Sequence, residues 1–182
     1  GKSTAAVRVL RDTIGVREFV NADTIATGLS AFDPSRVALQ AGRLMLERLE
    51  DLATQSVDFA FETTAASRTF APWLLSLKSK GYTNELFFFW LPSAEMAIAR
   101  VAGRVAEGGH HVPDETVRRR YKRGLTNFFS LYRPLADHWC LYNSAIEEPS
   151  LIAEGQASSQ LLVHDDRIWT KLCLEYDFEA HP

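Results

Sequence analysis

The four residues Gly1-Lys2-Ser3-Thr4 open the chain and match the end of a phosphate-binding P-loop. A complete P-loop reads G-x-x-x-x-G-K-[S/T] and follows a strand. Its backbone N–H groups surround the phosphates, its lysine reaches the β- and γ-phosphates, and its hydroxyl binds Mg²⁺. The sequence contains only the G-K-S end, without the strand and glycine-rich arc expected before it. A helix start capped by Ser3 or Thr4 would look the same, so the tetrapeptide indicates a phosphate site only if later motifs agree.

The size and charge of the chain indicate one globular domain over residues 1–182. Its residues are 46% apolar, which is enough to fill a sizeable core. Twenty basic residues against 23 acidic ones give a net charge of -3, so the balance does not indicate nucleic acid or an anionic membrane as a partner. Without a spanning apolar run or a signal-peptide pattern, we expect a cytoplasmic protein. Cys140 and Cys173 lack C-x-x-C spacing and are expected to be small buried side chains.

Short β-rich runs alternate with longer amphipathic stretches, which is the pattern of an α/β fold. The run Glu85–Leu91, ELFFFWL, is apolar almost without a break, so we expect a central strand covered on both faces by helices. Ser150–Ala153 and Gln160–His164 could form a closing hairpin, followed by a helix that ends near residue 178. The remaining strands are predicted at Arg17–Asn21, Val57–Phe61 and His138–Tyr142.

Three longer helices are predicted from apolar residues at helical spacing. The first runs from Pro34 to about Ala53, and the second begins at Ser93. Between the second and the third, Gly108–His111 resembles a mobile connection rather than a tight turn. The third begins at Pro113, a favoured first helical position. Its apolar stripe consists of Val117, Tyr121, Leu125 and Phe128.

Polar residues follow the first two predicted strands, where Asn21 and Asp23 end one strand and Glu62, Thr63 and Thr64 end the other. Open parallel sheets bind ligands outside the carboxyl ends of their strands, so these residues are candidates for a site. Asp23 could accept the proton of a hydroxyl that attacks a γ-phosphoryl group, or it could cap the next helix. The second group could hold the hydroxyls of a sugar or nucleoside, or it could form a strand-to-helix cap.

Arginines gather on both sides of the Gly-Gly-His-His segment. Arg100 and Arg104 lie one helical turn apart before it, and Arg118–Arg120 with Arg123 follow on the third helix. Arginines brought over a γ-phosphate by a closing segment would stabilise the transition state and exclude water, so residues 104–120 are a predicted lid. The alternative is that these charges are the solvated face of a helix, and the sequence does not choose among the arginines.

Two groups of metal-ligand residue types are set aside. His110-His111 with Asp114, and the run from His164 to Asp166, have no diagnostic ligand spacing. Asp165-Asp166 is better explained as hairpin or helix-cap chemistry. The tryptophans and the Phe87–Phe89 run are expected in the core, because basic residues are not interleaved with them as they would be on a nucleic-acid surface.

Nine short motifs follow one another along the chain, and they are specific only as an ordered set. They are G-K-S-T, R-E-F-V-N-A-D, F-D-P, A-G-R-L-M-L-E-R, F-A-F-E-T-T, L-F-F-F-W-L, R-V-A-x-R-V-x-x-G-G-H-x-V-P, R-R-R-Y and L-Y-N-S. From Gly1 to about Ala153 this order resembles the zeta-toxin-like P-loop kinases, in the branch of predicted ATPases. The resemblance implies a three-layer P-loop kinase fold with a mostly parallel sheet, and it implies ATP with Mg²⁺ as cofactors. It also implies phosphorylation of a hydroxyl of UDP-N-acetylglucosamine and a small antitoxin partner.

The resemblance also implies roles for individual residues. Lys2 is similar to the phosphate-binding lysine, Ser3 to the Mg²⁺-linked hydroxyl, and Asp23 to the catalytic base. Gly1 and Thr4 complete the nucleotide-binding turn. Lys2 is counted with the catalytic residues, as are the lid arginines Arg104, Arg119 and Arg120. The nucleotide contacts also include Arg104, Arg118 and Asn143. The implied substrate-binding residues are Asn21, Asp23, Glu62, Thr63, Thr64 and Arg68.

The sequence therefore predicts an ATP-dependent kinase that transfers a phosphoryl group to a hydroxyl deprotonated by Asp23. One alternative is a kinase for another acceptor, such as a nucleoside or an antibiotic. A nucleic-acid end is the least supported acceptor, because the chain lacks the positive charge that nucleic-acid binding requires. The second alternative is a non-catalytic module that binds a nucleotide or regulates a partner protein.

Overall fold

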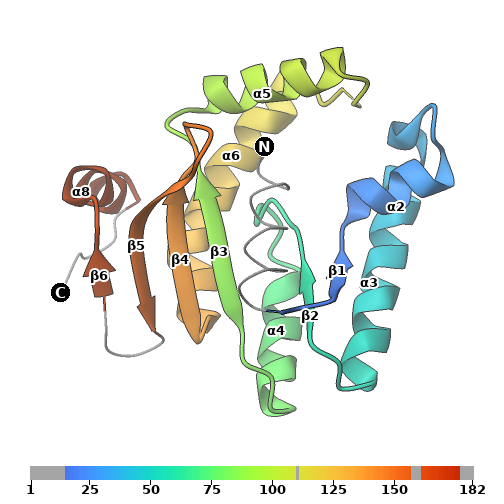
Figure 1. Cartoon of the computed structure of the whole chain (residues 1–182), viewed down its shortest axis with the longest axis horizontal. Helices are drawn as coiled ribbons and strands as arrows, with labels where there is room; N and C mark the ends of the chain where they lie inside the picture. The colour runs from blue at the N-terminus through green and yellow to red at the C-terminus, as the bar shows by residue number, and fades with distance from the viewer. Residues whose placement is uncertain (1–14, 110, 157–160, 177–182) are drawn as a thin grey trace. The chain divides into compact units, whose positions relative to one another are not determined.

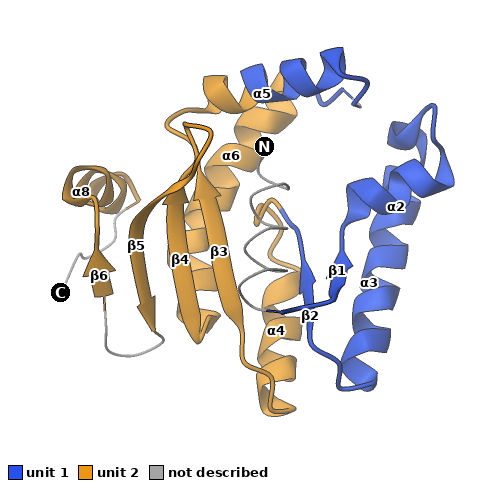
Figure 2. Cartoon of the chain, viewed as in Figure 1, with its two compact units in different colours: residues 1, 3–63, 99–113 blue, residues 2, 64–98, 114–182 orange. Residues whose placement is uncertain are grey.

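The computed structural model describes residues 15–109, 111–156 and 161–176 (Figure 1). The predicted phosphate loop at Gly1–Thr4 lies outside these ranges. The described residues form two compact units (Figure 2): unit 1 contains residues 15–63 and 99–113, and unit 2 contains residues 64–98 and those from 114 onward. None of the helices in the described ranges has the length and hydrophobicity needed to cross a membrane.

Unit 1 contains a two-stranded parallel sheet and its crossover helices. β1 (Glu18–Val20) pairs with β2 (Phe59–Phe61), with Glu18 opposite Phe59. Parallel strands need a long crossover connection. Here it consists of α2 (Ala22–Leu29), the 3₁₀ helix η2 (Pro34–Val37) and α3 (Ala38–Thr54). The predicted strands and the predicted helix are therefore confirmed, and α3 buries Ala41, Met45, Leu49 and Leu52.

The helix α5 (Ala94–Ala106) ends in a tight turn built on two glycines. Gly108 has a φ of +92°, and its N–H donates to the Val105 carbonyl at 3.0 Å. The Gly109 N–H donates to the Arg104 carbonyl at 2.8 Å, which completes a Schellman motif. A Cβ at Gly109 would lie only 2.6 Å from the Arg104 side chain. The prediction that this pair forms a loose connection rather than a tight turn is wrong, because both glycines serve to end the helix.

Unit 2 contains a four-stranded sheet in the order β3-β4-β5-β6 (Figure 1). β3 (Glu85–Trp90) and β4 (His138–Asn143) are parallel, whereas β5 (Ser150–Gln156) and β6 (Leu161–Val163) pair in antiparallel fashion. The predicted hairpin strands are confirmed, but the described sheet is mixed rather than mostly parallel. Within the described ranges β3 pairs only with β4 and lies at an edge of this sheet, so the prediction of a central strand is not confirmed. Uninterrupted hydrophobicity reflects burial of the strand's faces and carries no information on its hydrogen-bonded neighbours.

An aromatic core packs the sheet of unit 2 against its helices. Phe128 and Leu141 have no exposed surface, and the rings of Trp139 and Trp169 stack with centroids 5.7 Å apart. The Arg133 guanidinium lies 5.2 Å from the centre of the Trp139 ring, and burial lowers the pKa of this arginine. The expectation that the tryptophans belong to the core is thereby confirmed for these two residues.

The last described helix, α8 (Asp166–Glu175), begins at the predicted cap. The Asp165 carboxylate accepts a hydrogen bond from the Ile168 N–H at 2.9 Å. The neighbouring His164 Nε2 lies 2.9 Å from Glu154 Oε1. Both side chains therefore have structural contacts, and the helix-cap interpretation of Asp165 is confirmed.

The helix α6 (Asp114–Asn127) packs its predicted apolar stripe into the core of unit 2. Val117 and Leu125 are buried, and the half-buried Tyr121 donates its hydroxyl to the Leu91 carbonyl at 2.8 Å. The chain then continues into the π-helical turn η3 (Phe128–Tyr132) and the short α7 (Arg133–Leu135). Because the stripe faces inward, the arginines of α6 lie on its exposed side.

The helix α4 (Phe70–Ser79) is tied to unit 2 by an ion pair. Lys78 Nζ lies 2.6 Å from Asp137 Oδ1, and the Asn84 N–H donates to Asp137 Oδ2 at 2.8 Å. Burial raises the pKa of the Asp137 carboxyl, but the hydrogen bonds from Lys78 and Asn84 outweigh it and hold the pKa below its ordinary value.

Candidate functional site

The Asn21 side chain joins the carboxyl ends of β1 and β2. Its Oδ1 accepts hydrogen bonds from the N–H groups of Asp23 at 2.7 Å and Thr24 at 3.1 Å, which makes Asn21 the N-cap of α2. Its Nδ2 donates to Glu62 Oε2 at 2.8 Å. The alternative that Asp23 caps this helix is therefore wrong. An amide side chain has both an oxygen that can accept from the helix start and N–H groups that can donate to a carboxylate, and Asn21 uses both.

Asp23 lies in the first turn of α2 with its side chain exposed. The part of the chain that the structure describes offers its carboxylate neither a hydrogen bond nor an ion pair. Negative charge is favoured at this end of a helix, because the first N–H groups carry partial positive charge. Asp23 in α2 and Glu62 after β2 thus contact the same Asn21 side chain, Asp23 through its backbone N–H and Glu62 through its carboxylate.

The segment that follows β2 enters unit 2 as a loop held by the end of α6 and by η3. Ala65 has a φ of +55°, a left-handed conformation that strains a residue with a side chain. The buried Asn127 Nδ2 donates to the Ala65 carbonyl at 2.8 Å, and the Tyr132 hydroxyl donates to the Ser67 carbonyl. Gly124 packs so closely that a Cβ there would lie 2.7 Å from the Thr64 carbonyl oxygen. These contacts fix the backbone that carries Thr64 and the residues after it.

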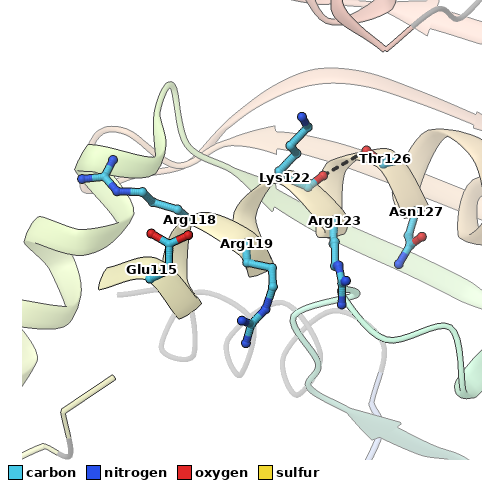
Figure 3. Close-up of a pocket in the computed structure, with 7 residues that line it drawn as sticks. All are labelled: Glu115, Arg118, Arg119, Lys122, Arg123, Thr126 and Asn127. Atoms are coloured by element: carbon cyan, nitrogen blue, oxygen red, sulfur yellow. Dashed lines mark hydrogen bonds between the residues drawn. The ribbon is translucent and has the colours of Figure 1, made fainter. Parts of the chain in front are cut away.

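A cavity of about 460 Å³ lies along α6 and is predominantly cationic (Figure 3). Arg119, Arg123 and Asn127 follow one another at four-residue intervals, and Figure 3 shows their side chains extending to the same side of the helix. Lys122 extends to another side in this view. The complete lining is Glu115, Arg118, Arg119, Lys122, Arg123, Thr126 and Asn127.

Arg118 is already engaged at the edge of this cavity. Its guanidinium forms an ion pair with Glu95 of α5. A backbone hydrogen bond and the contact with Arg118 lower the pKa of the Glu95 carboxyl below its ordinary value. Glu95 therefore offsets the charge of Arg118, and the positive charge that remains in the cavity comes mainly from Arg119, Lys122 and Arg123.

The other predicted site residues lie at separate places in the two units. In unit 1, Arg104 is exposed near the end of α5, and Thr63 is exposed after β2. In unit 2, Arg68 and Arg120 are exposed, and Arg120 does not line the cavity. Asn143 ends β4, and its Oδ1 accepts a hydrogen bond from the Ala145 N–H at 3.0 Å.

Two residues of α6 with contacts at this site, Gly124 and Asn127, were missed by the sequence-based prediction. Arg123 was grouped with the other arginines of this helix but was not assigned to the site. The spacing of Arg123 and Asn127 from Arg119 was a usable signal, because residues four apart share a helix face. The close approach of Gly124 to Thr64 had no signal in the sequence, since these residues are 60 positions apart and meet only in the folded unit.

No family model matches the chain. An uncharacterised protein of Haemophilus influenzae is 24% identical over 106 residues, which cover 58% of this chain and 76% of that protein. A solved structure from the PezAT chromosomal toxin-antitoxin system of Streptococcus pneumoniae superposes with a TM-score of 0.61 at 12% identity. The match covers 97% of this chain and 80% of the other. At this identity the likeness shows the fold alone, and it confirms the predicted α/β fold.

Proposed function

We propose that the protein is an ATP-dependent kinase of the zeta-toxin type, which phosphorylates a hydroxyl group of a small molecule. The observation that carries the proposal is the group formed by Asn21, Asp23 and Glu62 at the carboxyl ends of two parallel strands. Ligands of open α/β sheets bind at such strand ends. The fold shared with a structure from a toxin-antitoxin system and the G-K-S-T tetrapeptide support the same assignment.

On the acceptor side, Asp23 would accept the proton of the attacking hydroxyl. An exposed carboxylate without a partner among the described residues is available for this role, and Asn21 fixes the backbone that carries it. Glu62 is held by the Asn21 amide and would orient a second hydroxyl of the acceptor. Thr63, Thr64 and Arg68 would extend the contacts to the rest of the acceptor.

On the phosphate side, the cationic cavity of α6 fits the charge of a phosphate chain. When bound, ATP with Mg²⁺ supplies the phosphoryl group and part of the positive charge that its transfer requires. Lys2 and Ser3 would hold the nucleotide and the metal together with Gly1 and Thr4. Arg104, Arg118, Arg119, Arg120 and Asn143 are the proposed contacts to the nucleotide.

We infer a sugar-nucleotide such as UDP-N-acetylglucosamine as the acceptor, with a nucleoside or an antibiotic as the alternative. The inference rests on the resemblance of the ordered motifs, and the described polar groups suit any acceptor with adjacent hydroxyls. An antitoxin protein is the proposed partner, because the matched structure belongs to a toxin-antitoxin system.

Transfer of the ATP γ-phosphate to UDP-N-acetylglucosamine, nucleosides and aminoglycosides tests the proposal directly. Asp23→Asn preserves the size of the side chain but removes the base, so transfer should fall by about 10²- to 10⁴-fold while ATP affinity stays unchanged. Asp51→Asn makes the same chemical change at an exposed position of α3 and should have no effect. Unchanged turnover in Asp23→Asn would exclude this residue as the base, and ATP binding without transfer to any acceptor would favour a regulatory module.

A further inference from the structure

The exposed side of α6 presents two arginines as a pair rather than as part of a diffuse charged face. Arg119 and Arg123 are one helical turn apart, and both line the same cavity. Residues at this spacing have Cβ atoms about 5 to 6 Å apart. Figure 3 shows both guanidinium groups extending to the side of α6 on which Asn127 also lies.

Neighbouring charges leave this pair as the cationic centre of the cavity. Arg118 is neutralised by Glu95, and Lys122 extends to another side of the helix in Figure 3. Neither Arg119 nor Arg123 forms an ion pair with a carboxylate of the described ranges. Glu115, the remaining acid of the lining, lies one turn before Arg119 and two turns before Arg123.

The helix face that carries the pair is anchored directly after Arg123. Gly124, the next residue, allows α6 to approach the Thr64 carbonyl, and the buried Asn127 donates to the Ala65 carbonyl at 2.8 Å. Ala65 keeps its left-handed φ of +55° under these contacts. Strained backbone persists where surrounding contacts over-determine it, and such positions cluster at binding sites. Arg123 is thus fixed relative to the loop that carries Thr64.

We propose that Arg119 and Arg123 bind the phosphate chain of a ligand in the α6 cavity, with the contacts of Gly124 and Asn127 holding the pair against the 64–67 loop. Guanidinium groups bind phosphate oxygens through paired hydrogen bonds, and two groups one turn apart suit two linked phosphates better than a single anion. The inference rests on the proposed kinase function and adds Arg123 to its site. The linked phosphates belong either to the nucleotide donor or to a nucleoside-diphosphate acceptor.

Calorimetric titration of the full chain with inorganic tripolyphosphate tests the pair without any need for catalysis. Arg119→Ala and Arg123→Ala should each weaken binding about 10-fold or more, since each removes a charged hydrogen-bond donor. Arg123→Lys should recover part of the affinity, because it restores the charge but not the paired geometry. Arg167→Ala is the control, as an exposed arginine of α8 that does not line the cavity.

Several outcomes would overturn the proposal. These are an unchanged tripolyphosphate affinity in Arg123→Ala, an equal loss in Arg167→Ala, and no binding of tripolyphosphate by the unmodified chain. Repeating the titrations with ATP and with UDP-N-acetylglucosamine identifies the source of the phosphates, because Arg123→Ala should weaken only the ligand whose phosphates it contacts. Arg123-dependent binding without phosphoryl transfer would refute the kinase function but keep the site. Phosphoryl transfer by the unmodified protein, together with unchanged ligand affinity in Arg123→Ala, would support the kinase function and refute the site.

Discussion

The sheet of unit 1 and the sheet of unit 2 differ in what their strands contribute. β1 and β2 have three residues each, only Val20 of β1 is buried, and polar side chains follow both strands directly. β4 and β5 are longer and carry Leu141, Ile152 and Ala153, which have no exposed surface. The smaller sheet thus presents chemical groups at its strand ends, whereas the larger one builds a core. We infer that substitutions in the sheet of unit 2 act mainly on stability and that substitutions at the ends of β1 and β2 act mainly on function.

The largest effect on stability should come from the aromatic core of unit 2. Phe128→Ala removes a fully buried ring that packs against Phe88 and Trp139, and we expect it to lower the free energy of unfolding by about 3 to 5 kcal/mol. Chemical denaturation followed by circular dichroism measures the change. Leu174→Ala, at a position that is 80% exposed, is the control and should stay within about 0.5 kcal/mol of the unmodified protein. A loss below about 1 kcal/mol in Phe128→Ala would contradict the assignment of the core.

The contact between α6 and the 64–67 loop can be tested with two helix glycines. Gly124→Ala would place a methyl group 2.7 Å from the Thr64 carbonyl oxygen, so we expect a loss of about 1 to 3 kcal/mol in unfolding free energy. Gly103→Ala, in α5, has open space around its Cβ and should be neutral or stabilising by up to about 1 kcal/mol. Thermal unfolding of both variants compares them under the same conditions, and equal effects would show that α6 does not approach the loop this closely.

The third prediction separates stability from function at the strand ends of unit 1. Asn21→Ala removes both the helix cap and the hydrogen bond to Glu62, so unfolding free energy should fall by about 1 kcal/mol. Asn21→Ser keeps a capping oxygen but lacks the amide N–H that holds Glu62. We expect Asn21→Ser to retain most of the stability while both variants lose about 10-fold in phosphoryl transfer. Full transfer activity in Asn21→Ser would show that the Asn21–Glu62 contact has no part in function.

The smallest effect concerns the pH dependence of the ion pair in unit 2. The folded-state pKa of Asp137 is depressed, so its contribution to stability is present above the unfolded-state pKa near 4 and is lost as pH falls through the folded-state value. We expect a contribution of about 1 kcal/mol or less, because the pair is partly exposed. When unfolding is measured from pH 7 to pH 2, the free energy of unfolding should fall less steeply with acidification in Asp137→Asn than in the unmodified protein. If the free energy of unfolding depends on pH in the same way in both proteins, the Lys78–Asp137 pair does not contribute to the acid sensitivity.

The sequence-based prediction was most accurate where one local rule decided the structure. The stripe from Val117 to Phe128 predicted the buried face of α6. Asp165, predicted to serve a hairpin or a helix cap, is a helix cap. Both features depend on residues within a few positions of one another. It was less accurate for Asn21, Gly108 and Gly109, because the contacts of these residues depend on where a strand or helix ends in the folded chain. The spacing of Arg119 and Arg123 was present in the sequence, but only the cavity distinguishes this pair from Arg118 and Arg120.

The sequence by itself determined the α/β alternation, the strands and helices, and the set of polar and cationic residues from which a site could be built. These properties depend on hydrophobic periodicity and on the chemistry of single side chains, which can be read locally. Only the tertiary structure decided that the Asn21 amide binds Glu62, that Glu95 neutralises Arg118, and that Gly124 and Asn127 clamp the strained Ala65 loop. Each of these contacts joins residues more than 20 positions apart. Such pairs meet only when burial of the core brings distant segments together, so local sequence patterns cannot predict which of these residues will be in contact.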